Sequence, residues 1–196
     1  MINLSRKSHD VLEIGGNSYS LDLSFDNVLR LLELQFDVNV HSLVKGYLAL
    51  EMLTGVNLSD VITLEESFEV FKLVFDSYIA NAKRVDNIQY DLEGNPLPTK
   101  MASDDIPDKL TYSLVYDADY IFASFMQAYG IDLVEQQGRL HWAKFNALIV
   151  GLPDDTKLMQ VLRIRSWKPS KGDSKEHKES MRKLQLEYSL PEDVMY

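Results

Sequence analysis

The chain has 196 residues, of which 45% are hydrophobic and 26% charged, and it contains no cysteine. This length and composition suit one globular domain, or a domain with appendages, that buries its own core. The absence of cysteine excludes disulfides, thiolate metal sites and cysteine nucleophiles. No window approaches the roughly 18 apolar residues that a membrane-spanning helix needs. The first residues lack the layout of a secretory signal, so we expect the protein to reside in the cytoplasm.

The negative charge is unevenly distributed along the chain. The net charge is −10: the first 162 residues hold 12 basic and 24 acidic side chains, whereas residues 163–196 hold 8 and 6. A surface this acidic repels nucleic acid and anionic membranes, and neither is an expected partner. The basic residues near the C-terminus are interleaved with acids, which is more typical of a solvated face than of a phosphate-binding patch.

The N-terminal part begins with the pattern of a β-hairpin. Residues 11–14 and 19–23 alternate apolar with polar side chains. Between them, residues 15–18 read Gly-Gly-Asn-Ser, and this turn sequence tolerates the positive φ that a tight turn requires. The sequence therefore predicts two antiparallel strands before the first helix.

Three helices are predicted after the hairpin. Ser24 is a candidate N-cap for the first, and Ser42 for a second that stops at Gly55. Thr63 begins the third, with Glu66 three residues later as in a capping box. The third helix has the clearest amphipathic pattern in the chain, which is typical of a helix that faces a core. Its apolar stripe consists of Phe68, Phe71, Phe75, Tyr78, Ile79 and Ala82.

The periodic pattern stops between residues 85 and 110, where turn residues predict a long surface loop. Three further helices are predicted beyond it. The first ends at Gly130, and the third is capped by Asp154 or Asp155. Residues 175–187 could form a solvent-exposed helix, or could stay disordered until a partner binds. The apolar faces of the three helices contain Ala118, Ile121, Phe122, Phe125 and Tyr129; Trp142, Phe145, Leu148, Ile149 and Leu152; and Leu158, Val161 and Leu162.

These patterns predict a mainly α-helical protein, in which an N-terminal β-hairpin leads into a helical domain of about six helices with a long central loop. We divide the chain into a hairpin with helices (1–84), a loop (85–110), a C-terminal helical part (111–167) and a polar tail with the composition of a mobile segment (168–196). The sequence leaves open whether the two helical parts share one core, and so whether there are one or two domains.

The densest group of carboxylates is a candidate site for a divalent metal ion. Such an ion requires several oxygen ligands. Residues two apart point to different faces of a helix, and acids in a first turn are favoured by the helix dipole, so a structural role is preferred. The group consists of Asp117, Asp119 and Asp132, with Asp104 and Asp105.

Two further sets of side chains are candidates for chemistry. His141 beside Trp142 could be a general base, but no nucleophile motif accompanies it. Arg163 and Arg165 with Trp167 resemble a small nucleic-acid patch, although Arg stems packed on aromatic rings explain them better. We therefore expect no catalysis, no cofactor and no metal. An enzyme that uses the aspartates and His141 is the least favoured hypothesis.

The stretch from Tyr116 to Arg165 carries a family resemblance. It contains an aspartate-bearing helix, a Tyr-Gly-Ile-Asp-Leu step at 129–133 and a Leu-His-Trp helix start at 140–142. In this order they resemble the gp-fifteen-like proteins of tailed phages and prophages of Gram-positive bacteria. One departure is Ala143, where such proteins are expected to have a second bulky residue.

The resemblance implies a tail assembly chaperone without catalytic residues. Such a chaperone would bind the tape-measure protein in the host cytoplasm and keep it soluble while the tail tube assembles. Further expected partners are a companion chaperone, the tail-tube protein and a second copy of this chain. The alternative is a structural tail or tail-completion protein that stays in the virion. Aromatic residues dominate interface hot spots, which makes four side chains candidate partner contacts, with a core position as the alternative for each. They are Phe122, Tyr129, Trp142 and Phe145.

Overall fold

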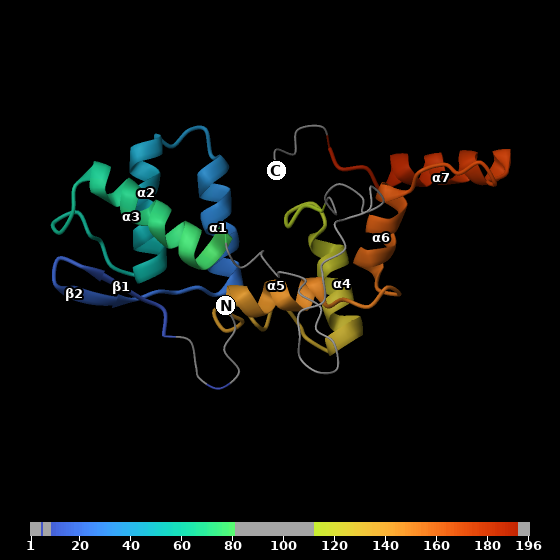
Figure 1. Ribbon diagram of the computed structural model, residues 1–196. Helices are drawn as coiled ribbons and strands as arrows, with labels where there is room; N and C mark the ends of the chain where they lie inside the picture. Colours follow the sequence, from blue (N-terminus) through green and yellow to red (C-terminus); the bar gives the residue numbers. More distant parts are fainter. Residues whose placement is uncertain (1–4, 6–8, 81–111, 192–196) are drawn as a thin grey trace, which may run out of the picture. The chain divides into compact units, whose positions relative to one another are not determined.

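The computed structural model describes residue 5 and the ranges 9–80 and 112–191. These residues separate into two compact units. Unit 1 contains residues 9–80 together with 134–150, and unit 2 contains residues 112–133 together with 151–191. The predicted loop at 85–110 lies outside the described residues. Figure 1 labels the α-helices and the strands of both units.

The hairpin opens unit 1 as predicted. Strands β1 (Val11–Ile14) and β2 (Asn17–Ser20) pair antiparallel, with Ile14 opposite Asn17. The turn residues Gly15 and Gly16 have φ of 56° and 77°, a region that glycine enters without steric cost. The second strand begins two residues earlier than the sequence pattern predicts and ends at Ser20.

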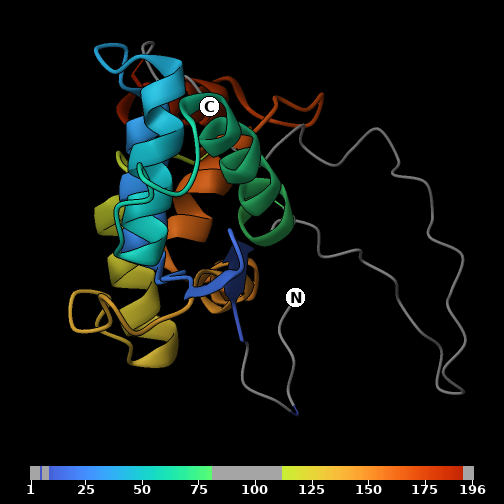
Figure 2. The same ribbon diagram turned by 90° about the vertical axis from the view of Figure 1, so that its left-hand side faces the viewer.

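Helices α1 (Phe25–Phe36) and α2 (Ser42–Thr54) follow the hairpin and lie side by side (Figures 1 and 2). Ser24 occupies the predicted N-cap position of α1, although its hydroxyl makes no cap hydrogen bond. The predicted cap of α2 is wrong by one residue. His41 is the N-cap, and its ring nitrogen accepts a hydrogen bond from the Leu43 N–H. Gly55 ends α2 in the left-handed conformation, as predicted.

Helix α3 (Leu64–Val74) begins with the predicted capping box between Thr63 and Glu66. It packs tightly against α2. The approach is so close that a Cβ added to Gly46 of α2 would lie 2.8 Å from the Phe68 Cα. A π-helical turn, η1 (Phe75–Ile79), continues the helix.

The core-facing stripe predicted for this third helix is partly wrong. Phe71 and Ile79 are buried, whereas Phe68 is 36% exposed. The close approach to α2 brings Ser67 inside, so the buried stripe runs through Ser67, Phe71 and Val74. The π-helical turn then places Ile79 inside, five residues after Val74. The predicted member Ala82 lies outside the described residues.

The segment 134–150 returns to unit 1 from the second half of the chain. Phe25 donates its backbone N–H to the Leu140 carbonyl (2.9 Å), and Trp142 donates its own to the Leu23 carbonyl (2.7 Å). These two bonds join the start of α1 to the start of α5 (Trp142–Val150). Our sequence-based division places this segment in the part at 111–167, whereas its packing in the structure is with the hairpin and the first helices.

Unit 2 is built from α4 (Ala118–Tyr129), α6 (Lys157–Ser166) and α7 (Lys175–Glu187). Gly130 ends α4 in the left-handed conformation, as predicted. The cap of α6 is Thr156 rather than Asp154 or Asp155. The core between α4 and α6 contains Ile121, Phe125, Leu158, Val161 and Leu162.

The polar stretch 175–187 is helical. Ser174 caps it by accepting a hydrogen bond from the His177 N–H, and no side chain of this described helix is buried. Over the described residues the protein therefore has one hairpin, seven α-helices and a π-helical turn. This arrangement confirms the predicted mainly α fold with an N-terminal hairpin.

Candidate functional site

Two of the four aromatic residues predicted to contact a partner lie in the core of unit 1. Trp142 and Phe145 are each 1% exposed. Their rings stack with centroids 5.7 Å apart, and Phe145 also stacks on Phe25 at 4.9 Å. The Trp142 Nε1–H donates a hydrogen bond to the Ile79 carbonyl, so its one polar group is satisfied inside. In this fold both residues hold α5 in place.

Phe122 and Tyr129 lie apart from that pair, on α4 of unit 2. Both side chains are half-buried. The Tyr129 ring meets the buried Phe125 ring edge-on, with centroids 5.8 Å apart. The structure therefore divides the four predicted residues between two units. That any of them contacts a partner stays a prediction.

The central aspartate of the carboxylate group that was a candidate for metal binding is part of a buried ion pair. Asp117 is 1% exposed, and both of its carboxylate oxygens lie 2.7 Å from the guanidinium of Arg165. One oxygen also accepts the Ser113 N–H at 2.9 Å. These contacts occupy the carboxylate. Among the residues that the structure describes, no three His, Asp or Glu side chains gather as a metal site would require, and Asp104 and Asp105 lie outside them.

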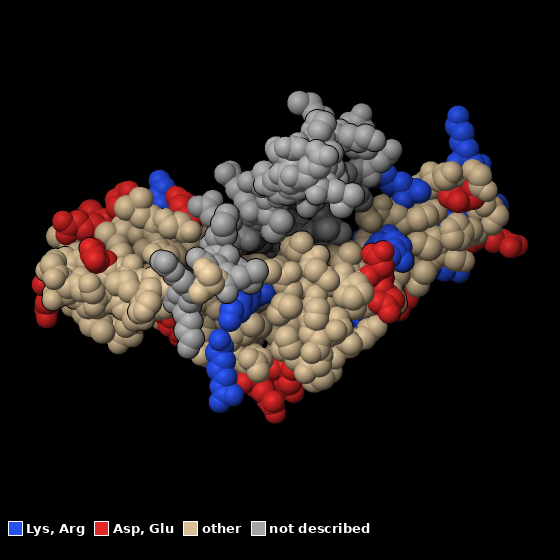
Figure 3. Space-filling view, turned by 60° about the horizontal axis from the view of Figure 1, so that its bottom comes forward, with Lys and Arg blue, Asp and Glu red and all other residues tan. Residues whose placement is uncertain are grey.

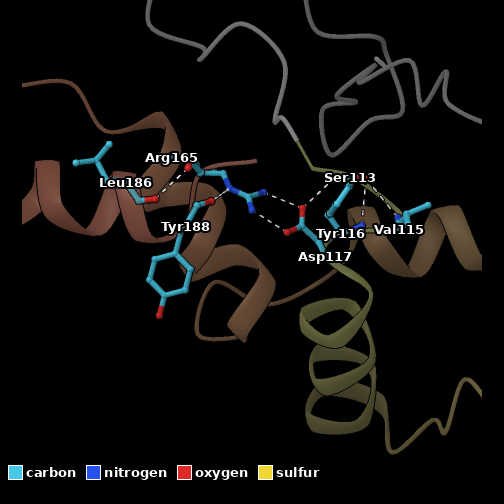
Figure 4. A network of polar contacts seen from close by, with 8 residues as sticks. Ser113, Val115, Tyr116, Asp117, Arg165, Leu186 and Tyr188 are labelled. Atoms are coloured by element: carbon cyan, nitrogen blue, oxygen red, sulfur yellow. Dashed lines mark hydrogen bonds and ion pairs between the residues drawn. The ribbon is translucent and has the colours of Figure 1, made fainter. Parts of the chain in front are cut away.

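Arg165 links three elements of unit 2 (Figure 4). From the end of α6, its guanidinium reaches Asp117 at the start of α4, and its Nε–H donates to the carbonyl of Tyr188 just after α7. The side-chain amide of Gln185 donates to the carbonyls of Ile164, Arg165 and Trp167 at the end of α6. The C-terminal end of α7 is therefore fastened to α6.

A second contact supports the same junction. The Lys157 ammonium donates a hydrogen bond of 2.9 Å to the Tyr188 hydroxyl and lies over the rings of Tyr188 and Tyr120. The hydrogen bond to Tyr188 raises the pKa of Lys157 above its ordinary value of 10.5. The lysine thus remains charged at neutral pH. The structural role expected for the arginines of α6 is present for Arg165, through a carboxylate and a carbonyl rather than an aromatic ring.

His141 caps the start of a helix. Its ring nitrogens contact a backbone N–H and a carboxylate, and neither belongs to a nucleophile motif. Its Nδ1 accepts the Ala143 N–H at 3.1 Å in the first turn of α5. Its Nε2 lies 3.0 Å from the carboxylate of Asp10. Because Nδ1 accepts this hydrogen bond, the ring proton lies on Nε2, which donates to Asp10. This geometry ties the hairpin to the start of α5 and explains the histidine by structure alone.

Comparison of the chain with protein-family models shows the family to which it belongs. The family model described as "Bacteriophage Gp15 protein" matches residues 7–190. The chain belongs to this family. No curated protein and no solved structure gives a significant match to it.

Membership supports a structural or tail-region role for this Gp15-family protein in a bacteriophage. The family is a structural one that is not known as enzymatic. None of the helices in the described ranges has the length and apolar composition needed to cross a bilayer.

The surface feature that our sequence analysis missed is an accumulation of exposed apolar side chains on the Gp15-family chain. Of 15 large apolar side chains that are exposed in the described residues, nine lie between residues 36 and 73. Exposed apolar side chains that gather in a patch mark contact sites more often than chance, so these residues are candidate contacts. A signal was available, since α2 is apolar on two sides. The nine are Phe36, Val38, Val44, Leu48, Val56, Val61, Leu64, Phe68 and Leu73.

The same region is acidic. Residues 36–74 contain six acidic side chains and two basic ones, a net charge of −4. One of the two bases, Lys45, donates a hydrogen bond to the Gln35 carbonyl. In Figure 3 the charged side chains are mostly red at the end of the picture that α2 and α3 occupy in Figure 1. The surface thus combines apolar area with negative charge.

Proposed function

We propose that this Gp15-family protein is a tail assembly chaperone. It binds the tape-measure protein in the host cytoplasm and keeps it soluble until tail-tube subunits polymerise around it. The observation that carries the proposal is the exposed apolar surface between residues 36 and 73. Family membership supports the tail-region setting.

A tape-measure protein that is not yet assembled needs a partner surface. A very long helical chain with apolar stripes aggregates unless another surface covers those stripes. A helical protein with exposed apolar side chains can cover them through contacts between helices. The net charge of −10 keeps the resulting complex apart from other complexes in solution. A companion chaperone and the tail-tube protein are further proposed partners, because tail-tube subunits must later replace the chaperone on the apolar stripes of the tape-measure protein.

The test is co-expression with the tape-measure protein of the same genome, followed by affinity capture and light scattering. We expect a soluble complex of fixed stoichiometry, and an insoluble tape-measure protein when it is expressed alone. The double variant Val44→Ser/Leu48→Ser removes two exposed apolar side chains from α2, and we expect it to reduce the yield of complex. Val150→Ser, at an exposed position at the end of α5, is the control.

Family membership supports equally a structural tail protein that stays in the virion. Mass spectrometry of purified particles separates the two functions. Absence from the particle supports the chaperone. Presence at a fixed copy number, together with failure to solubilise the tape-measure protein, would replace the chaperone by the structural role.

A further inference from the structure

Helix α7 lacks the burial that normally stabilises a helix of its length. It has 13 residues, and none of them is buried. Isolated helices shorter than about 12–15 residues are marginal in water, and most helical stability in proteins comes from packing. Gln185 and Tyr188 fasten its C-terminal end to α6. In its first turn the His177 ring meets the Trp167 ring edge-on, with centroids 5.8 Å apart. The exposed side of the helix would gain stability from a further surface.

One side of α7 carries two bases and an apolar residue at regular spacing. Lys178, Arg182 and Leu186 are four residues apart, so they follow one another at about 6 Å along one side of the helix. Leu186 is 77% exposed, Arg182 is exposed and Lys178 half-buried. This strip is a candidate contact surface.

Helix α3 carries the opposite charges at the same spacing. Glu65, Glu69 and Leu73 are also four residues apart on one side of their helix. All three are exposed, and Leu73 is 67% exposed. The described residues of unit 1 hold 5 basic and 13 acidic side chains, a net charge of −8, whereas residues 168–187 hold 6 and 4, a net charge of +2.

We infer that α7 of one copy of this chain packs alongside α3 of a second copy, with the two helices parallel. Leu186 then lies on Leu73, Arg182 opposite Glu69, and Lys178 opposite Glu65. The charges specify the direction. In the antiparallel arrangement centred on Arg182 and Glu69, Leu186 would face Glu65 and Lys178 would face Leu73. Two α3 helices cannot pair in this way, because like charges would meet.

The contact joins two different surfaces, one on each copy. Such a head-to-tail contact closes into a ring or continues as an open chain of copies, depending on the rotation between neighbours. Helices α3 and α7, labelled in Figure 1, belong to different units, and Leu73 of α3 and Leu186 of α7 are both exposed, so each copy offers both surfaces. The inference does not rest on the proposed function, although an extending row of copies suits a long partner.

The test is sedimentation velocity of the full chain over a range of concentrations at low and high salt. We expect the wild type to exceed its monomer mass of 22.5 kDa at low salt, and the excess to fall as salt screens the ion pairs. Glu65→Lys/Glu69→Lys and Lys178→Glu/Arg182→Glu should each weaken association by about tenfold or more. Glu13→Lys/Glu33→Lys, an equal charge change elsewhere on unit 1, should preserve it.

Charge exchange gives the decisive result. The variant that combines both reversals restores opposite charges across the contact, and we expect it to associate again at low salt. Leu73→Ser and Leu186→Ser should each weaken association without changing net charge. Circular dichroism checks that every variant is folded. A wild type that stays monomeric at all concentrations overturns the inference, and so does a folded combined variant that does not associate.

Discussion

The sharpest prediction concerns the buried ion pair of unit 2. Arg165→Met removes the guanidinium that meets both oxygens of Asp117 at 2.7 Å. Asp117 is 1% exposed and would be left buried with only the Ser113 N–H. Breaking a buried pair by removing one partner costs about 3–5 kcal/mol. Losing the hydrogen bond to the Tyr188 carbonyl adds about 1 kcal/mol. We therefore expect the free energy of unfolding to fall by about 4 kcal/mol or more.

Arg163 provides a matched control on the same helix. Its guanidinium lies 3.5 Å from Asp154, but the two side chains are 63% and 84% exposed. Water and salt screen such a pair, so Arg163→Met should cost less than about 1 kcal/mol. The difference between the two methionine variants isolates the effect of burial, because helix, residue type and substitution are the same.

Urea denaturation can be followed separately in the unit that contains the pair. The chain has two tryptophans, Trp142 in unit 1 and Trp167 immediately after α6 in unit 2. In a Trp142→Phe background, fluorescence therefore reports on unit 2. Arg165→Met should lower the urea midpoint, and Arg163→Met should leave it nearly unchanged.

The double variant Asp117→Leu/Arg165→Met tests whether the unpaired carboxylate causes the loss of stability in Arg165→Met. It removes both charges, so no carboxylate remains buried without its cation, and replacing a buried pair by apolar residues is often close to neutral. We expect it to recover most of the stability that Arg165→Met loses. A deficit of about 1 kcal/mol should remain, because the Ser113 N–H has lost its acceptor. If the double variant is as unstable as Arg165→Met, the loss arises from packing and the electrostatic reasoning is refuted. Equal midpoints for the two arginine variants would refute it as well.

Three further predictions concern unit 1. Gly46→Ala should destabilise the protein by about 1–3 kcal/mol, because the new Cβ would meet the Phe68 backbone at 2.8 Å, whereas Gly172→Ala, with nothing within 4 Å, should be neutral in thermal unfolding. Thr63→Ala should cost about 1 kcal/mol in urea denaturation through loss of the helix cap. The backbone hydrogen bond from Thr63 holds the pKa of Glu66 below its ordinary value of 4.5. Ionised Glu66 thus stabilises the fold above pH 4.5, and its advantage over Glu66→Gln should vanish as the pH falls through the lowered pKa; an advantage that persists in acid would contradict the assignment.

Local patterns in the sequence predict the elements whose causes are local. The hairpin follows from two glycines in the turn, and the start of α3 follows from Thr63 and Glu66 three residues apart. The ends of α2 and α4 follow from single glycines that adopt positive φ. In each case the residues that decide the structure are within four positions of one another, so a single sequence contains the information.

The contacts that build the candidate sites are not local. Asp117 and Arg165 are 48 residues apart, and Phe25 is far in sequence from its stacking partner Phe145. The sequence identifies Asp117 as a notable carboxylate and Arg165 as a structural arginine, but periodicity alone cannot pair them. The exposure of Phe68 depends on how closely α3 approaches Gly46, which is a property of the packed helices. Buried and exposed aromatic residues therefore show the same helical periodicity, and the sequence alone does not distinguish them.

This ambiguity decides how partner binding must be tested. Replacing Trp142 or Phe145 by alanine would remove a side chain that is 1% exposed, at a cost of about 3–5 kcal/mol. Lost binding in such a variant would follow from the loss of unit 1 and would say nothing about a contact. Val44 and Leu48 are 40% and 37% exposed, so serine at these positions removes apolar surface and costs less stability than truncation of a fully buried aromatic. A contact on this surface would then appear as lost binding in a variant whose unit 1 remains folded, a combination that the buried aromatics cannot produce.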